Sequence, residues 1–309
     1  MAGSGSAIFP DAIDYCTRLP GSSDFLLITP APFQARLAWI DLRRVQLMRA
    51  QETAARVRYV CLPAERAFVT FPIHRDTTLI CGGFELSPGD IVFHAHGERF
   101  HERTAGPARW GSVSMRVETL SLFARTLTGN ELAPPPAGLI IRPKPADRRR
   151  MLQIHARAVR IAETKIGLVG HPEVSRALEE DLIWALLTCL TADSRQDVRV
   201  VELREPIMVQ FEDVLAAFRD RIPGVTEISD AIGTPQSVLQ SCCLRVLGMN
   251  PARYLHLRRL TMVQSLLVRA RLAVGVSASD LSRQHGFADI HHFVTEYRRA
   301  FGNFPGEFE

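Results

Sequence analysis

Histidine and glutamate side chains gather in the stretch FHAHGERFHERTAG, residues 93–106. Side chains at positions i and i+2 of a strand point to the same face, so His94 and His96 could ligate one metal ion, with a nearby glutamate as the third ligand. Glu98 follows very closely, Glu102 stands farther away, and the next predicted strand, WGSVSMRV, contains no histidine. We therefore interpret the stretch as polar surface or pocket lining and expect no metal there, with a metal-dependent enzyme as the alternative.

The six cysteines show no spacing that is typical of a zinc site or a disulfide framework. Cys242 and Cys243 are adjacent, but no basic residue lies directly beside them to lower a thiol pKa, so we expect them to fill the core. The sequence shows no Ser/His/Asp arrangement, phosphate-binding glycine loop or catalytic pair of carboxylates. It therefore predicts no enzyme activity and no cofactor.

The composition is typical of a globular protein with about two domains. The chain has 309 residues, of which 46% are hydrophobic and 23% charged, and its net charge of +4 permits an anionic partner without requiring one. The N-terminus lacks the basic start and apolar core of a signal peptide, and the longest apolar run, LIWALLTCL, is too short to span a bilayer. We expect a cytoplasmic protein.

These candidate residues need elements that position them, and residues 1–145 are predicted to supply short strands. Segments of β character alternate with turn residues, and a proline-rich joint at 133–145 closes this half. Closely spaced strands of this kind predict a β-sandwich or a small barrel. The region of β character runs from about Asp24 to Val117, and examples of its segments are RVRYVCL (56–62), RAFVTFPI (66–73), TTLICGGFEL (77–86), DIVFHAH (90–96) and WGSVSMRV (110–117).

Residues 146–205 change to a helical period. Two segments, DRRRMLQIHARAVRIAETK and PEVSRALEEDLIWALLTCL, repeat apolar residues at three- and four-residue spacing, which predicts two helices. The second helix carries a wide apolar stripe, which could pack against its own domain or against a second subunit. The stripe consists of Val174, Leu178, Leu182, Ile183, Leu186 and Leu190.

Everything after Pro206 is predicted to be helical. Two units share one layout. Each begins with a short helix, continues through a glycine break, and ends with a second helix that stops before a glycine. This is the layout of a helix-turn-helix. The helix between them is about 20 residues and hence roughly 30 Å long. It could hold two recognition helices about one DNA turn, roughly 34 Å, apart. The predicted helices are 209–221, 225–232, 235–247, 251–271, 277–285 and 289–300.

Residues 209–308 resemble the DNA-binding domain of the AraC/XylS family of bacterial transcription regulators. The resemblance is carried by GMNPARYLHLRRL after the first unit and by GF-x-D-x-x-x-F-x-x-x-YRRAFG-x-x-P-x-x-F in the second. The first half resembles, more weakly, the cupin-like sensor domains of many such regulators. The resemblance implies an α+β multidomain chain: a cupin-like β-sandwich or barrel in 1–145, a helical dimerisation or linker segment in 146–205, and an all-α, homeodomain-like double helix-turn-helix in 206–309.

The resemblance also assigns DNA-contacting side chains. On the groove-facing side of the first recognition helix it places Ser237, Gln240 and Ser241, and on that of the second His291, Val294 and Thr295, with His292 beside them. Four arginines are expected to contact phosphates, namely Arg258, Arg259, Arg298 and Arg299. The residues expected to point inward as the core of the second unit are Phe287, Phe293, Tyr297 and Phe301.

The sequence therefore predicts a sequence-specific transcription regulator that binds double-stranded operator or promoter DNA as a homodimer. The resemblance implies that a small-molecule effector in the N-terminal domain controls it, and RNA polymerase is a further candidate partner. Two alternatives stay open: a metal-dependent cupin enzyme with a DNA-binding tail, and a regulator without an effector that is controlled by its abundance or by a protein partner. Both activation and repression are compatible with the sequence.

Overall fold

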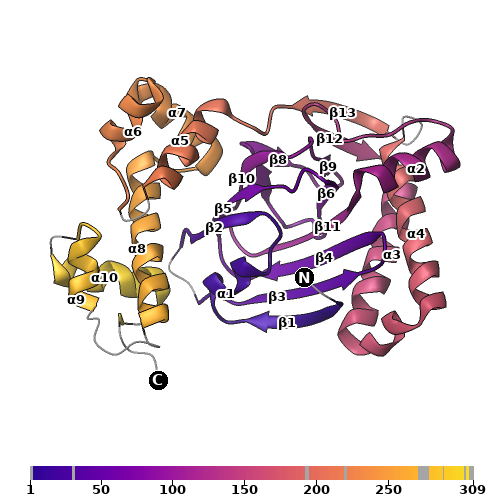
Figure 1. The fold of residues 1–309 in the computed structure, drawn as a ribbon, viewed down its shortest axis with the longest axis horizontal. Helices are drawn as coiled ribbons and strands as arrows, with labels where there is room; N and C mark the ends of the chain where they lie inside the picture. The colour runs from indigo at the N-terminus through magenta and orange to yellow at the C-terminus, as the bar shows by residue number, and fades with distance from the viewer. Residues whose placement is uncertain are drawn as a thin grey trace.

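In the computed structural model, sheets form the N-terminal part of the chain and helices form the C-terminal part (Figure 1). The structure describes residues 3–29, 32–191, 195–218, 221–270, 278–287, 289–302 and 304–305. Two sheets lie face to face, helices cover the outer face of the larger sheet, and the C-terminal helices pack beside the smaller one. None of the described helices has the length and apolar character that crossing a membrane requires.

The larger sheet has eight antiparallel strands in the order β1-β3-β4-β11-β6-β9-β12-β13. Three of them, β6, β9 and β11, overlap segments singled out in the sequence, and β3 and β4 lie within the wider region of predicted β character. Their bounds are β1 Gly5–Phe9, β3 Ala35–Asp41, β4 Val45–Glu52, β6 Arg66–Pro72, β9 Ile91–Phe93, β11 Ala108–Arg116, β12 Gly138–Pro143 and β13 Arg195–Val201.

The smaller sheet has five strands in the order β2-β5-β10-β7-β8, and a short helix, α1 (Ala12–Thr17), precedes β2. The prediction of one strand over 77–86 is wrong, because Gly82 and Gly83 have φ angles of 56° and 90° and turn the chain into a hairpin. The strands are β2 Ser22–Leu27, β5 Arg56–Cys61, β7 Leu79–Cys81, β8 Phe84–Leu86 and β10 Arg99–Thr104.

Three helices, α2 (Val117–Thr128), α3 (Pro145–Thr164) and α4 (Pro172–Leu190), cover the larger sheet, with a 3-10 turn at Ile166–Gly170 between α3 and α4. The apolar stripe of α4 packs into this layer: Leu182 and Leu186 are only 1% and 2% exposed. Of the two roles open to the stripe, the structure therefore supports packing in the core of its own subunit.

The segment 146–205 is not an independent helical linker in this structure. Its helices pack on the larger sheet, and after α4 the chain adds β13 to that sheet beside β12. The predicted boundary at residue 145 thus falls inside one continuous packing unit.

The C-terminal helices follow the predicted order closely. The first begins at Pro206, three residues before the predicted start, because proline is well tolerated at the first position of a helix. The domain organisation of a sheet-rich N-terminal part and a helical C-terminal part is confirmed, while the cupin-like character of the sheets stays a prediction. The helices are α5 Pro206–Ala217, α6 Val225–Ile232, α7 Gln236–Leu247, α8 Pro251–Ala270, α9 Ala278–Gln284 and α10 Ile290–Phe301.

Candidate DNA-binding interface

The first helix-turn-helix unit consists of α6 and α7. Gly233 ends α6 with a φ of 69°, in the left-handed region that glycine adopts without steric cost. Ile228 on α6 and Leu239 and Cys243 on α7 are fully buried, so the opposite face of α7 is left to solvent. That exposed face carries the predicted base-reading residues Ser237, Gln240 and Ser241.

The second unit consists of α9 and α10, separated by Gly286, whose φ is 84°. The Asp289 carboxylate caps α10 by accepting hydrogen bonds from the backbone N–H groups of His291 and His292 at 2.8 and 3.3 Å. The predicted inward residues are buried, except that Phe301 is half-buried. Of the predicted base readers here, His291, His292 and Thr295 are exposed, and Val294 is half-buried against the core.

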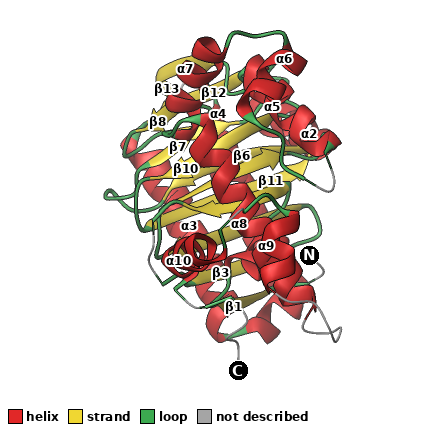
Figure 2. Cartoon of the chain, turned by 90° about the vertical axis from the view of Figure 1, so that its left-hand side faces the viewer, coloured by secondary structure: helices red, strands yellow, loops and turns green. Residues whose placement is uncertain are grey.

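Helix α8 joins the two units and separates their recognition helices. It spans Pro251–Ala270, which is 20 residues and therefore about 30 Å long. Figures 1 and 2 show α7 near one end of α8 and α10 near the other. This arrangement is compatible with contacts to two successive major grooves, whose spacing is about 34 Å.

The four arginines expected at phosphates lie in different environments. Arg298 and Arg299 on α10 are exposed, whereas Arg259 is half-buried and donates a hydrogen bond to the backbone oxygen of Ile222 at 3.2 Å. Arg258 is largely buried: only 13% of its side chain is exposed, and its guanidinium is paired with two carboxylates, so its phosphate contact stays a prediction. In this arrangement the Arg258 guanidinium faces the N-terminal domain, and its pairing with Asp24 and Glu212 competes with a phosphate contact.

Of the two cysteines expected in the core, Cys243 fills it as predicted, whereas Cys242 is half-buried against the same apolar cluster. The Cys243 side chain is fully buried and its sulfur lies 3.8 Å from the Met208 sulfur. Burial raises the pKa of its thiol to about 12, so the thiolate form is absent at neutral pH.

A buried network of ionisable side chains joins the C-terminal helices to the smaller sheet. Glu212 on α5 accepts a hydrogen bond from the Tyr254 hydroxyl at 2.7 Å, and its Oε1 lies 2.9 Å from Nε2 of His101 on β10. Arg258 on α8 forms ion pairs with Glu212 and, at 2.8 Å, with Asp24 on β2. We call these five residues the interdomain network.

The charge of Glu212 is compensated at close range. Burial alone would raise the pKa of its carboxyl, but Arg258, His101 and Tyr254 together lower that pKa to about 2. Burial, followed by the charge of Glu212, raises the pKa of Tyr254 well above its usual range. At neutral pH the network therefore holds a buried carboxylate paired with a buried guanidinium. Removing only one of the two partners would destabilise the fold, because the other charge would stay buried without compensation.

The sequence reading missed the interdomain network, although α5 carries a signal for it. Met208, Phe211 and Leu215 form the buried stripe of α5, and Glu212 occupies a position on the same stripe. An acidic residue on an apolar helical face is almost never fully buried unless it is paired. Its partners come from distant strands and from α8, so sequence spacing cannot identify them.

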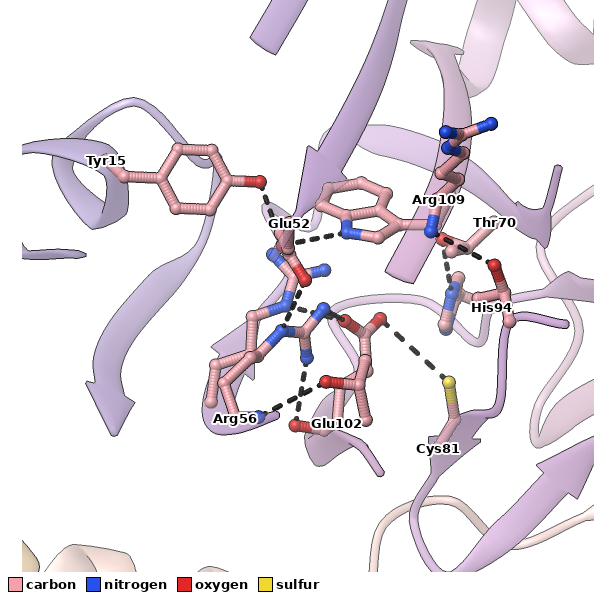
Figure 3. A network of polar contacts seen from close by, with 12 residues as sticks. Tyr15, Glu52, Arg56, Thr70, Cys81, His94, Glu102 and Arg109 are labelled. Carbon is pink, nitrogen blue, oxygen red and sulfur yellow. Dashed lines mark hydrogen bonds and ion pairs between the residues drawn. The ribbon is translucent and has the colours of Figure 1, made fainter. Parts of the chain in front are cut away.

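A second polar network lies between the two sheets (Figure 3). The Glu52 carboxylate accepts hydrogen bonds from Tyr15 at 2.8 Å and Trp110 at 2.9 Å, and it pairs with Arg56 at 3.0 Å. Arg56 in turn pairs with Glu102 at 2.5 Å. Burial alone would raise the pKa of Glu102, but Arg58 and Arg56 lower it to about 2. These polar groups fill space inside the β domain and satisfy one another.

The two histidines considered as metal ligands in the alternative interpretation, His94 and His96, do not converge. His94 is 1% exposed, with Nδ1 at 2.8 Å from Glu98 and Nε2 at 3.0 Å from Thr70, whereas His96 is exposed. Strand β9 ends at Phe93, so the alternation expected of a strand does not extend to His96. Among the residues that the structure describes, no three His, Cys, Asp or Glu side chains form a metal-binding group.

Several known proteins are similar to the chain. It is 28% identical over 142 residues to a protein of Rhodococcus erythropolis named "Probable thc operon regulatory protein", a match that covers 46% of the chain and 42% of that relative's length. Among solved structures, the AraC-like transcriptional activator CuxR is 15% identical over 85% of the chain and 95% of its own, with a TM-score of 0.45. ToxT from Vibrio cholerae is 12% identical over 86% of the chain and 96% of its own, with a TM-score of 0.32.

The C-terminal part of the chain also matches a family model. The match covers residues 228–309, and the family is described as "Helix-turn-helix domain". These residues include most of α6 and all of α7–α10, the two units whose geometry is described above. Residues 228–309 therefore contain a helix-turn-helix domain.

Proposed function

We propose that the protein is a sequence-specific DNA-binding transcription regulator of the AraC/XylS type. One observation carries the proposal: two helix-turn-helix units sit near opposite ends of α8, and each presents an exposed recognition helix. The family match over residues 228–309 supports it independently of the geometry. Double-stranded DNA with two half-sites about one turn apart is the partner that fits this spacing.

The N-terminal domain is proposed to control DNA binding. Its smaller sheet meets α5 and α8 through the interdomain network, and Leu26 and Val57 of that sheet share an apolar cluster with the first helix-turn-helix unit. An effector that shifts β2 or β10 would change how these helices are held. Control then amounts to a population shift between arrangements that differ in DNA affinity.

Base recognition is proposed to lie on α7 and α10. Glutamine suits the N6/N7 edge of adenine, histidine can contact several bases, and Thr295 can pack its methyl group on a thymine methyl, so operators rich in A·T pairs at key positions are expected. A good bidentate contact contributes about 1–3 kcal/mol of discrimination. The exposed positions of Gln240 and His291 permit such contacts.

Binding-site selection with the full chain tests this assignment. Gln240→Ala and His291→Ala should relax the base preference at separate positions about one turn apart. Arg299→Ala should weaken binding to all sequences alike and reduce the salt dependence, because phosphate contacts carry no sequence information. Unchanged selected sequences for both Gln240→Ala and His291→Ala would show that other faces enter the grooves. Failure of the unaltered chain to select any sequence would contradict the proposed function.

A further inference from the structure

Strand β13 forms one edge of the larger sheet. Within the described part of the chain, β13 pairs with β12 on one side and with no strand on the other. Residues 196–200 of this strand are all exposed, and Val198 and Val200 are 38% and 72% exposed. An edge strand with free backbone N–H and C=O groups is a template for pairing with another strand.

We infer that β13 is a homodimer interface, in which β13 of a second copy of this chain pairs with it antiparallel about a two-fold axis at Val198. This inference does not depend on DNA binding. The strand reads RQDVRVV over residues 195–201, and the axis at its central residue pairs all seven positions with their counterparts. The two larger sheets would then form one continuous sheet.

The charge pattern of β13 favours a second copy as the partner. In the register centred on Val198, Asp197 of each copy lies opposite Arg199 of the other, and the two Val198 side chains face one another. The same strand placed about an axis at Asp197 or Arg199 would set like charges directly opposite. A two-fold interface must be complementary to itself, and this register of β13 fulfils that condition.

The surroundings of β13 agree with this role. Arg199 already pairs with Asp90 at 2.9 Å, and Asp90 also pairs with Arg142 on β12 at 2.8 Å. Asp197 lies directly opposite Arg142 of β12 and projects from the same face as Arg199. A second copy would extend this row of alternating charges across the sheet edge. Strand β1 at the opposite edge reads GSAIF and carries no charged residue, so it offers no such complementarity.

Sedimentation of charge-reversed full-length chains tests the interface. Asp197→Arg places arginines opposite arginines and should raise the dimer dissociation constant at least about tenfold, since like charges directly opposite are destabilising. Arg199→Asp should do the same with carboxylates, while Asp90 keeps Arg142 as a partner. The two single variants, when mixed, should form a heterodimer, because each position then faces the opposite charge.

Two further variants separate the interface from effects on folding. Val198→Lys, which removes no ion pair, sets two ammonium groups face to face and should also yield monomers. Ile8→Lys, at a 54% exposed position on the opposite edge, is the matched control and should leave the dimer intact. A monomeric parent chain would overturn the inference. So would a dimer that Asp197→Arg and Val198→Lys leave unchanged, or single variants that stay monomeric when mixed.

Discussion

Glu212→Gln tests the interdomain network most directly. The substitution keeps the shape of the side chain and removes its charge, so Arg258 loses one of its two carboxylate partners and His101 faces a neutral amide. Glu212 is only 4% exposed, so solvent cannot replace the lost interactions. We expect a marked loss of stability in the full-length chain.

The pKa of Glu212 sets the size of the effect. The folded protein lowers this pKa from 4.5 to about 2. A tenfold change in an equilibrium constant corresponds to about 1.4 kcal/mol, so the carboxylate contributes about 3 kcal/mol to the free energy of unfolding at pH 7. Because the folded pKa lies below the unfolded one, this contribution is complete above the unfolded pKa and is lost as the pH falls through the folded pKa.

Urea unfolding of both proteins at a series of pH values provides the measurement. The free energy of unfolding of the Gln variant should be lower by about 3 kcal/mol at pH 7, and the difference should shrink below about pH 4.5. Glu102, whose pKa is also lowered to about 2, titrates in both proteins and cancels from the difference. Glu227→Gln, at an exposed ion pair, is the control and should change little. A loss under about 1 kcal/mol, or one independent of pH, would refute this reasoning.

Two further predictions concern the boundaries of the folded units. A fragment of residues 206–309 should fold and bind DNA with salt-dependent affinity, since it contains both helix-turn-helix units; a helical fragment that retards no genomic DNA at low salt would contradict this. Leu186→Glu should prevent folding of the intact chain instead of producing folded monomers, because Leu186 is 2% exposed in the core. Ala177→Glu, on the exposed side of α4, is the control and should leave the fold intact. A Leu186→Glu chain that circular dichroism and sedimentation show to be a folded monomer would contradict the core assignment.

The C-terminal helices were predictable because their signals are local. Apolar spacing, Gly233 and Gly286 identify each helix and each break within a few residues of the observed bounds. The hairpin of β3 and β4 lies in the region of predicted β character, but its two strands were not singled out, because the three residues between them, Leu42-Arg43-Arg44, include no glycine, proline or asparagine. Strand β13 was also missed, because it follows two helices and its pairing with β12 joins residues far apart in the sequence.

The candidate site shows the same division between local and distant information. Which face of α7 or α10 is exposed follows from the spacing of buried residues along one helix, and the predicted base readers lie on the exposed faces, apart from the half-buried Val294. Arg258 and Arg259 are neighbours on α8, and helical geometry turns them in different directions. The direction of the Arg258 side chain brings its guanidinium to the carboxylate of Asp24, which lies 234 positions away in the chain and therefore cannot be identified from local spacing.

The position of the interdomain network explains how one contact could govern two DNA-binding units. Tyr254 and Arg258 lie on α8, which carries the first unit near its start and the second near its end. The second unit also contacts α8 directly, since Nε2 of His256 on α8 lies 3.2 Å from a carboxylate oxygen of Glu296 on α10. A displacement of Asp24 or His101 therefore acts on α8 itself. Because α8 also sets the distance between α7 and α10, such a displacement would change how well both recognition helices fit successive grooves of one DNA duplex.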